Sequence, residues 1–399
     1  MSAVASGVPV LRSPEAAVQA ARAYAAAIAP GAAARDRAAT VPRDELAAFD
    51  ATGLLGITVP REDGGPGLGP PVLADVVRTI AAADPAIAQI PQAHWLFVDV
   101  LAVWGTEAQR RRLFADVLAG ARIGNALAER GGLHAQDLRT RLLPGPVLDG
   151  RKYYCTGSLT SRWIAVSALD PEDRLRLAFV RRDAPGVTVD DDWDAMGQRA
   201  TVSGTTTFEQ VAVDPDLVLP YDQAYAVPQQ LGARAQLVHA AIEAGIARGA
   251  LDDAAAYLRE RARPSSEAVR AGAGAAIEDP HVLHGYGRLS ARVAAAEALL
   301  AQAATTLERI GLVPADAQAA ARGSLAVAAA KAFASEVAVE VASELFRLCG
   351  TSATAGKHDL DRHWRNARTH SVHDPMDWKY HHIAAFELGG VLPPNHGQL

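Results

Sequence analysis

Two long alanine-rich regions flank a middle region of short β-prone segments, and this order is the strongest constraint on the fold. From about residue 14 to 122, and again from about residue 230 onward, apolar residues recur at three- and four-residue spacing, which predicts amphipathic helices. Between these regions, short runs such as GRKYYCTG and GTTTFEQVAV alternate with Gly, Pro and Asp, which predicts strands and turns. We therefore expect a mainly α protein with a central β domain, divided into a helical domain at 1–123, a β domain at 124–229 and a helical bundle at 230–399.

The composition argues against several classes of protein. The chain has 399 residues and a formal net charge of −6, which disfavours nucleic acid or an anionic membrane as the main partner. Its two cysteines, Cys155 and Cys349, cannot build a disulfide framework or a cysteine-rich metal site. The N-terminal stretch lacks a basic segment followed by an apolar one, and we find no run of about 20 uncharged apolar residues. We expect a cytoplasmic protein without a signal peptide or a membrane span.

A late segment, RHWRNARTHSVHDPMDWKYHH at 362–382, holds five of the chain's 12 histidines together with arginine, tryptophan and tyrosine residues. His370 and His373 are three residues apart, so on a helical turn they would project from one face. Spacing alone equally suits histidines that are satisfied in the core or at an interface. We expect His363, His381 and His382 to serve packing or to face solvent. A metal site would require carboxylate partners that the segment does not clearly supply.

Several segments, in order along the chain, resemble the acyl-CoA dehydrogenase superfamily. VPREDGGPGLGP is similar to its Pro-Glu-x-x-Gly-Gly-x-Gly loop, and GTEAQRRRLFADVLAGARIGNALAERGG to the stretch that enters its β domain. GRKYYCTGS resembles its flavin-facing strand, and WDAMGQRATVSGTTTFEQVAV the strand pair that closes the β domain. The resemblance covers nearly the whole chain. It implies an N-terminal helical domain, a middle β-barrel and a C-terminal four-helix bundle.

The segment WRNARTHSVHDP favours one branch of this superfamily. Dehydrogenases carry a glutamate here that abstracts a proton from the substrate, whereas this form looks like the reduced-flavin monooxygenases typified by dibenzothiophene monooxygenase. QIPQAHWLF, which contains His94, is also similar to that branch. The ungapped match puts Asp374 at the glutamate position, and Ala235 at a second position that some dehydrogenases use for the base. Both residues weigh against dehydrogenation, which needs a carboxylate base at the substrate Cα.

The resemblance implies that reduced flavin and oxygen form a C4a-hydroperoxide, which survives in a dry pocket that hydrogen-bonds it. A neutral imidazole can donate one hydrogen bond and accept another. We therefore predict His373 beside the flavin, His94 completing the pocket, and His370 in a supporting or phosphate-side position. Asn125 is predicted to bond the flavin or the peroxide, with a turn cap as the alternative. Cys155, where relatives carry serine, is predicted either in the catalytic site or as a small buried apolar residue.

The other predicted cofactor residues fall in separate parts of the sequence. Three residues of YYCTGS offer hydroxyl groups and backbone amides to a flavin edge: Tyr154, Thr156 and Ser158. Arg261, in a segment where family members carry an arginine that reaches a neighbouring subunit's flavin, is predicted to bind a phosphate, with Arg259 and Arg263 as alternatives. Ser352 lies in LCGTSATAG, which is similar to a dehydrogenase segment that holds the FAD pyrophosphate across a dimer. Without the resemblance, that segment is simply the end of a helix.

These expectations combine into a two-component monooxygenase that oxygenates a heteroatom, preferably sulfur, of a small apolar substrate. Reduced FMN, or less favourably reduced FAD, would come from a separate NAD(P)H:flavin reductase, because the chain has no Gly-x-Gly-x-x-Gly nicotinamide motif of its own. Amine or aromatic hydroxylation, an FAD-dependent acyl-CoA dehydrogenase using Asp374, and an inactive helical scaffold remain alternatives. The alanine-rich helices after residue 230 and the position of Arg261 predict a homotetramer.

Overall fold

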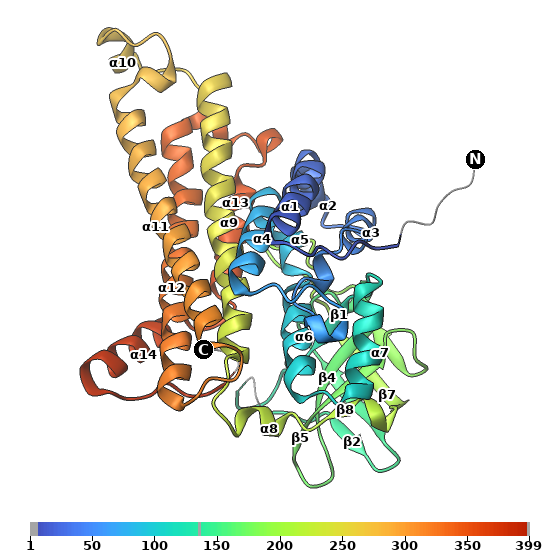
Figure 1. The fold of residues 1–399 in the computed structure, drawn as a ribbon. Coiled ribbons are helices and arrows are strands. Elements are labelled where there is room, and N and C mark those ends of the chain that lie inside the picture. The colour runs from blue at the N-terminus through green and yellow to red at the C-terminus, as the bar shows by residue number, and fades with distance from the viewer. Residues whose placement is uncertain (1–6, 135–136, 397–399) are drawn as a thin grey trace.

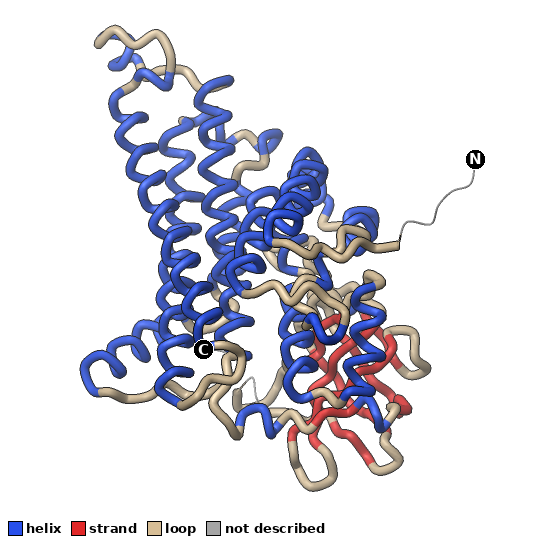
Figure 2. The backbone as a smooth tube through the Cα atoms, in the orientation of Figure 1, coloured by secondary structure: helices blue, strands red, loops and turns tan. Residues whose placement is uncertain are grey.

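The computed structural model describes residues 7–134 and 137–396 and arranges them in three regions that follow the order of the chain (Figures 1 and 2). Helices form the first and third regions, and all the strands drawn in Figure 2 gather in the second. The predicted mainly α fold with a central β domain is confirmed. Residues 1–6, part of the stretch for which no signal peptide is expected, lie outside the described residues.

Side-chain caps mark the starts of three of the N-terminal helices. Ser13 accepts a hydrogen bond from Ala16 N–H at the start of the first helix, and Thr106 and Gln109 form a reciprocal capping box at the start of the last. The helices are α1 Pro14–Ile28, α2 Ala32–Ala38, α3 Arg43–Asp50, α4 Pro70–Ala83, α5 Pro85–Gln89, α6 Gln92–Trp104 and α7 Glu107–Leu118.

Helices α5 and α6 form an apolar wedge between the β domain and the C-terminal bundle. The stretch Pro85–Trp104 is long and apolar enough to cross a membrane by composition, but 83% of its most apolar window is buried inside the protein, as in a core helix. Helix α6 contacts both strand β1 Ile123–Ala126 and the long C-terminal helix α9 Leu231–Glu260. The burial of this stretch therefore serves the contact between domains.

The middle region is one sheet of eight strands in the order β6-β7-β3-β2-β4-β5-β8, with β1 paired in parallel to β4. Among the described residues, β6 and β8 have no second strand partner, so the predicted barrel is open at that seam. The strands after β1 are β2 Arg141–Leu143, β3 Val147–Lys152, β4 Trp163–Leu169, β5 Leu175–Arg181, β6 Val187–Val189, β7 Thr206–Ala212 and β8 Val218–Leu219.

Three long helices dominate the C-terminal region and lie side by side in Figure 1, with a shorter helix, α13, packed on two of them as the fourth. Gly245 and Gly249 let α4 approach the first long helix closely, because a Cβ at either position would lie within 2.7 Å of an α4 backbone oxygen. Much of the small-residue surface is thus used inside the subunit. The helices are α8 Asp222–Tyr225, α9 Leu231–Glu260, α10 Ser266–Arg270, α11 Pro280–Ile310, α12 Ala317–Cys349, α13 Asp361–Ser371 and α14 Met376–Gly389.

Candidate active site

The first group of predicted residues meets where β1 packs on the 154–158 turn of the β domain. Ser158 Oγ donates to the Asn125 carbonyl at 2.8 Å, and Asn125 Nδ2 donates to the Tyr154 carbonyl at 3.4 Å. The Asn125 N–H also donates to the Thr156 carbonyl, at 3.2 Å. Asn125 Oδ1 is buried and has no hydrogen-bond partner among the described residues. Because an unsatisfied buried acceptor is costly, this oxygen is well suited to receive an N–H group of a ligand.

Strained backbone surrounds this turn. Tyr154, Gln198 and Val202 have φ values of 56°, 52° and 47°, which side-chain-bearing residues rarely adopt. Such strain is concentrated at functional sites in proteins. The Thr156 hydroxyl shares a hydrogen bond of 2.8 Å with Ser203, so the turn and the 196–204 loop form one polar surface.

The 196–204 loop connects this surface to helix α13. The Gln198 N–H donates to Asn366 Oδ1 at 2.6 Å. At Gly197 the two backbones lie so close that an added Cβ would be 2.0 Å from the Arg365 carbonyl oxygen. The side-chain amide nitrogen and oxygen of Gln198 are both buried without a partner among the described residues. In the sequence, the MGQR segment was noted only for its resemblance to the acyl-CoA dehydrogenase superfamily. The role of Gln198 in joining the β domain to α13 was not predicted.

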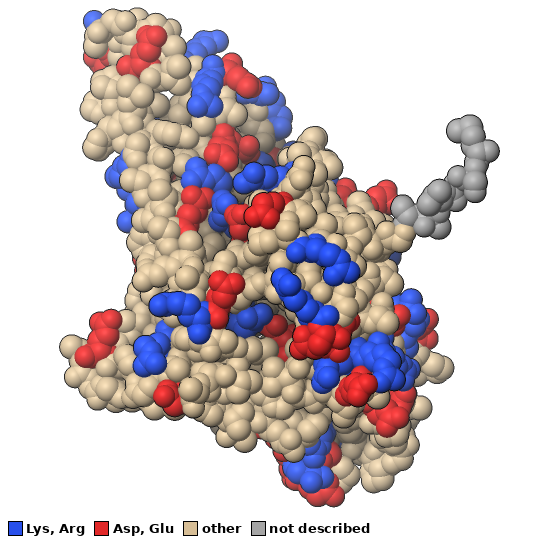
Figure 3. Space-filling view, viewed as in Figure 1, with Lys and Arg blue, Asp and Glu red and all other residues tan. Residues whose placement is uncertain are grey.

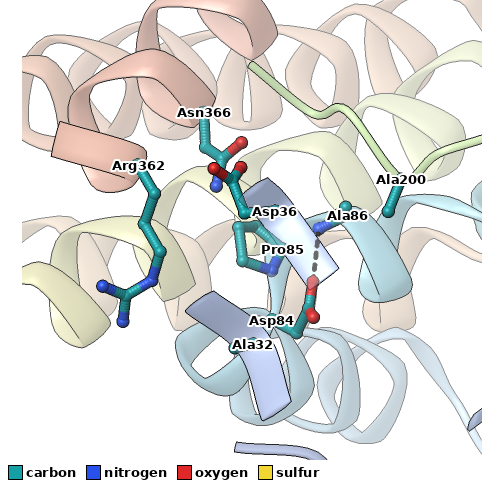
Figure 4. A pocket seen from close by; sticks show the side chains of 8 residues that line it. All are labelled: Ala32, Asp36, Asp84, Pro85, Ala86, Ala200, Arg362 and Asn366. Atoms are coloured by element: carbon teal, nitrogen blue, oxygen red, sulfur yellow. Dashed lines mark hydrogen bonds between the residues drawn. The ribbon is translucent and has the colours of Figure 1, made fainter. Parts of the chain in front are cut away.

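A narrow recess lies beside the same contact, where α2, α5, α13 and Ala200 meet (Figure 4). Its polar groups already have protein partners. Asp36 pairs with Arg365 at 2.6 Å, Asp84 accepts the Ala86 N–H at 3.1 Å, and Arg362 pairs with Asp253 at 2.5 Å. We therefore assign no cofactor to this recess.

The second group of site residues is a cluster of three histidines from α9, α13 and the turn after it. His370 Nε2 lies 3.1 Å from His239 Nδ1, and the ring centroids of His239 and His373 lie 4.0 Å apart. Glu243, one turn after His239 on α9, places Oε1 2.7 Å from His370 Nδ1. The structure thus brings the predicted His370 and His373 together and adds His239 and Glu243, which were not predicted. The only sequence indication was a histidine and a glutamate four residues apart within an otherwise apolar helix, LVHAAIEAG.

Asp374, at the position of the dehydrogenase glutamate, is held between two buried lysines. Lys331 contacts its Oδ1, and Lys379 Nζ lies 2.8 Å from its Oδ2. Burial alone would raise the pKa of Asp374, but contact with His373 and the charges of both lysines outweigh it and hold that pKa well below its ordinary value. A carboxylate with so low a pKa is a poor proton acceptor. At the second base position, Ala235 offers only its backbone oxygen, which Gln92 already occupies.

His94 links the N-terminal helices to the β domain. It is fully buried, its Nε2 lies 3.0 Å from the Leu55 carbonyl, and its Nδ1 accepts the Ile123 N–H at 3.1 Å. Burial lowers the pKa of His94 to about 4, so the ring is neutral at physiological pH. These two bonds position β1, which carries Asn125. The predicted direct contact of His94 with a cofactor or oxygen would require one of the bonds to break.

Cys155 lies inside the hydrophobic core of the β domain, together with Ile164, Val166 and Phe208. Its side chain is fully buried, and burial raises the pKa of the thiol to about 12. The thiol therefore stays protonated, although Thr206 and the charge of Lys152 partly offset the effect of burial. This position matches the alternative of a small buried residue, and we do not include Cys155 in the candidate site.

Arg261 and Ser352 lie at the far end of α9. Ser352 Oγ accepts a hydrogen bond of 2.9 Å from the Tyr257 hydroxyl, and Arg261 is exposed with Nη1 3.2 Å from His358 Nδ1. At about 1.5 Å of rise per residue, His239 and Arg261 are about 33 Å apart along the axis of α9. Within one protomer, the predicted phosphate residues therefore lie far from the histidine cluster.

Comparison with protein families assigns the two helical regions of the chain. Residues 13–121 match the model of the acyl-CoA dehydrogenase N-terminal domain, and residues 237–378 match the model of the acyl-CoA dehydrogenase C-terminal domain. The two matched segments lie on either side of the β domain, so they account for both helical regions.

Individual relatives fall in the branch that the late histidine segment favours. The chain is 35% identical to the dibenzothiophene monooxygenase of Rhodococcus erythropolis over 386 residues, which cover 90% of each protein. It is 31% identical to the "Probable FMNH2-dependent monooxygenase SfnC" of Pseudomonas putida, over 96% of this chain and 98% of that protein. The crystal structure of FMN-bound TdsC from Paenibacillus sp. A11-2 superposes with a TM-score of 0.91 at 29% identity, covering 96% of this chain and all of that one. The chain therefore belongs to the acyl-CoA dehydrogenase family, in the branch that contains the dibenzothiophene monooxygenases.

Proposed function

We propose that this protein is a two-component, FMN-dependent monooxygenase that oxygenates the sulfur atom of a small, largely apolar substrate. The relatives named above support the reaction class and the cofactor. The observation that carries the proposal is the arrangement of Asp374 and His373 in the segment 362–382. Asp374, at the base position, is neutralised by Lys331 and Lys379, while the neighbouring His373 presents an imidazole to the outside of the cluster.

The groups around Asn125 suit the ring of a flavin. Reduced FMN, when bound, supplies the two electrons that activate oxygen, so that one oxygen atom enters the substrate and the other becomes water. Asn125 Oδ1 would accept from a ring N–H, and Thr156 with its partner Ser203 would offer hydroxyl groups. Ser158 would act on the flavin only through Asn125, because its hydroxyl already donates to the Asn125 carbonyl. Tyr154 contributes the positive φ of the turn.

We assign to His373 the hydrogen bond or proton transfer to the oxygen atom that reacts with the substrate. Its side chain is 44% exposed, while the rings of His239 and His370 behind it are buried. A neutral imidazole in this position can donate a hydrogen bond or a proton to an oxygen atom and accept one from the substrate side. The apolar groups and paired charges behind it keep bulk water from the inner face of the site.

The phosphate side of the site requires a second subunit. Arg261 lies about 33 Å along α9 from His239, and Ser352 contacts Tyr257 near the same end of the helix, so we propose that both serve the cofactor of a neighbouring copy in a homotetramer. Exposed apolar residues on α14 and beyond support such contacts: Trp378, Tyr380, Leu388 and Val391. The face drawn in Figure 3 carries charges of both signs between wide uncharged areas.

We further propose that the enzyme is cytoplasmic and receives its reduced FMN from a separate NAD(P)H:flavin reductase. A cofactor that must arrive and leave in each cycle favours weak binding of its oxidised form. We therefore expect micromolar or weaker affinity for oxidised FMN, about −8 kcal/mol or less in magnitude, and lower activity with reduced FAD.

The test is oxygen incorporation with the purified protein. Chemically reduced FMN, dibenzothiophene as the probe substrate and 18O-labelled oxygen gas should yield a product that carries the label on sulfur, as read by mass spectrometry. Amine and phenol probes in parallel test nitrogen and aromatic carbon as the oxygenated atom. Tight copurified FAD, with reduction of an artificial acceptor by an acyl-CoA and no labelled product, would instead establish a dehydrogenase.

A further inference from the structure

The three histidines of the candidate site lead inward to a buried carboxylate for which the proposed chemistry gives no role. Glu243 is 0% exposed, and His370 and His239 are 4% and 2% exposed, whereas the side chain of His373 is 44% exposed. Contacts of 2.7 Å from Glu243 to His370 and 3.1 Å from His370 to His239 lead to the ring of His373, 4.0 Å away between centroids. The four side chains form a line from an enclosed carboxylate to an open imidazole.

Glu243 determines where His370 carries its proton. An ionised carboxylate only accepts hydrogen bonds, and Glu243 Oε2 has no partner among the described residues, so the proton on His370 Nδ1 is the compensation for a buried charge. His370 Nε2 can then accept the Nδ1 proton of His239. Alternatively, a doubly protonated His370 donates from Nε2 to Gln89 Oε1, which lies at 3.1 Å, and to His239. The two states differ by one proton and require opposite tautomers of His239.

We propose that Glu243 and His370 are positioning residues that set the tautomer of His239 and thereby the orientation and proton affinity of His373. The inference rests on the proposed function, because it takes His373 as the group that acts on oxygen. His239 transmits the effect because its ring lies directly against that of His373 and its dipole changes direction with the tautomer.

Charged groups from several helices face this line of residues. Lys331 on α12 and Lys379 on α14 contact Asp374, whose carboxylate lies 3.7 Å from His373 Nδ1. Two lysines are thus balanced by two carboxylates, Asp374 and Glu243. Replacing Glu243 by a neutral side chain leaves a net positive site, which disfavours protonation of His373 and lowers the pH at which it titrates.

The same two helices provide a matched control. His363 Nε2 on α13 lies 2.8 Å from Asp253 Oδ2 on α9, which is a second buried histidine paired with a carboxylate between these elements. Among the described residues, no hydrogen bond or ion pair joins this pair to the three-histidine cluster. A general weakening of the α9–α13 contact would therefore follow from changing either pair, whereas an effect on His373 would follow only from changing Glu243 or His370.

The experiment compares Glu243→Gln and His370→Asn with Asp253→Asn and His373→Ala, each as the full-length protein with reduced FMN. The ratio of oxygenated product to oxygen consumed should fall about tenfold in the first two variants and stay within about twofold in Asp253→Asn. A tenfold loss is at the lower end of what is found for partners that orient metal-binding histidines. The acid side of the pH profile of that ratio should move to lower pH in Glu243→Gln. Glu243→Asp should recover part of the loss.

A second measurement does not depend on turnover. Solid-state NMR of the 15N-histidine-labelled protein without cofactor should show a changed tautomer signature for a buried histidine in Glu243→Gln and none in Asp253→Asn. Unchanged coupling and tautomers in Glu243→Gln and His370→Asn, with coupling lost in His373→Ala, would overturn this inference and leave the proposed function intact. Normal coupling in His373→Ala would overturn the inference together with the assignment of His373 to the oxygen, whereas the proposed function would be overturned only by wild-type protein that forms no labelled product. Failure of Glu243→Gln and His370→Asn to fold, with Asp253→Asn folded, would make the role structural and also overturn the inference.

Discussion

The two ends of helix α9 carry site residues of opposite character. Near its start, His239 and Glu243 are enclosed by α12, α13 and the N-terminal helices, and their polar atoms contact one another. At its end, Arg261 is exposed, and its side-chain partner within the described residues is His358. The buried end can influence the chemistry without a second subunit, because its polar side chains pair with one another. The exposed arginine at the other end of the helix does not reach the histidine cluster of its own protomer. This difference is the basis of our proposal that the ring and the phosphate of one cofactor are held by different subunits.

The largest effect on product yield is expected from replacing His373, the exposed member of the histidine cluster near the start of α9. His373→Ala should keep the fold and the flavin affinity but release oxygen as hydrogen peroxide, with product per oxygen consumed falling about tenfold or more because the proton donor is lost. Peroxide and product assays check this together. His381→Ala, on the exposed side of α14, is the control and should behave as wild type. Full coupling in His373→Ala would place the oxygen chemistry elsewhere.

A large effect on affinity is expected at the exposed end. Arg261→Ala should weaken FMN binding by about 1.5–3 kcal/mol, the usual loss for a charged hydrogen bond, while product per bound flavin stays the same. Fluorescence titration of reduced and oxidised FMN measures this loss. The control is Arg270→Ala on α10, an exposed arginine that pairs with Glu267. Equal affinity in Arg261→Ala and wild type would show that the phosphate is bound by other residues.

The buried charges beside the histidines should govern acid stability. The pKa of Asp374 in the folded protein is held below its ordinary 3.8, so its contribution is complete above that pH and is lost as the pH falls through and below it. Asp374→Asn should therefore unfold more easily at neutral pH, by about 3–5 kcal/mol, and show a shallower loss of stability in acid. Urea unfolding at several pH values measures both. The exposed Asp377→Asn should change neither, and a steep acid loss retained in Asp374→Asn would contradict this account.

The smallest effect is expected for the buried thiol of the β domain. Cys155→Ala removes one buried atom and should cost about 1 kcal/mol of stability with coupling unchanged. Thermal unfolding and the product assay separate these quantities. A drop in coupling at unchanged stability would return Cys155 to the catalytic group.

The sequence predicted the order of domains because helical and strand periodicities differ over long stretches. It also predicted that His370 and His373 share one face, because they are three residues apart, and their rings do stack on one another. It did not predict His239, Glu243 or Gln198. Their partners lie more than 100 positions away, and only the packing of α9, α13 and the 196–204 loop brings them together. The alanine-rich surface taken as a sign of subunit contact is largely used against α4 and α12, as Gly245 and Gly249 illustrate.

The division of one cofactor site between subunits is tested most directly by complementation. His373→Ala and Arg261→Ala chains carrying different tags are coexpressed, mixed assemblies are purified, and product formation is measured at limiting reduced FMN. In mixed tetramers whose subunits pair at random, slightly more than a quarter of the sites receive an intact His373 from one subunit and an intact Arg261 from the other, so about a quarter of the wild-type activity should return. Mixed assemblies no more active than the two parent variants would contradict the account, because both residues would then have to serve the same protomer's site.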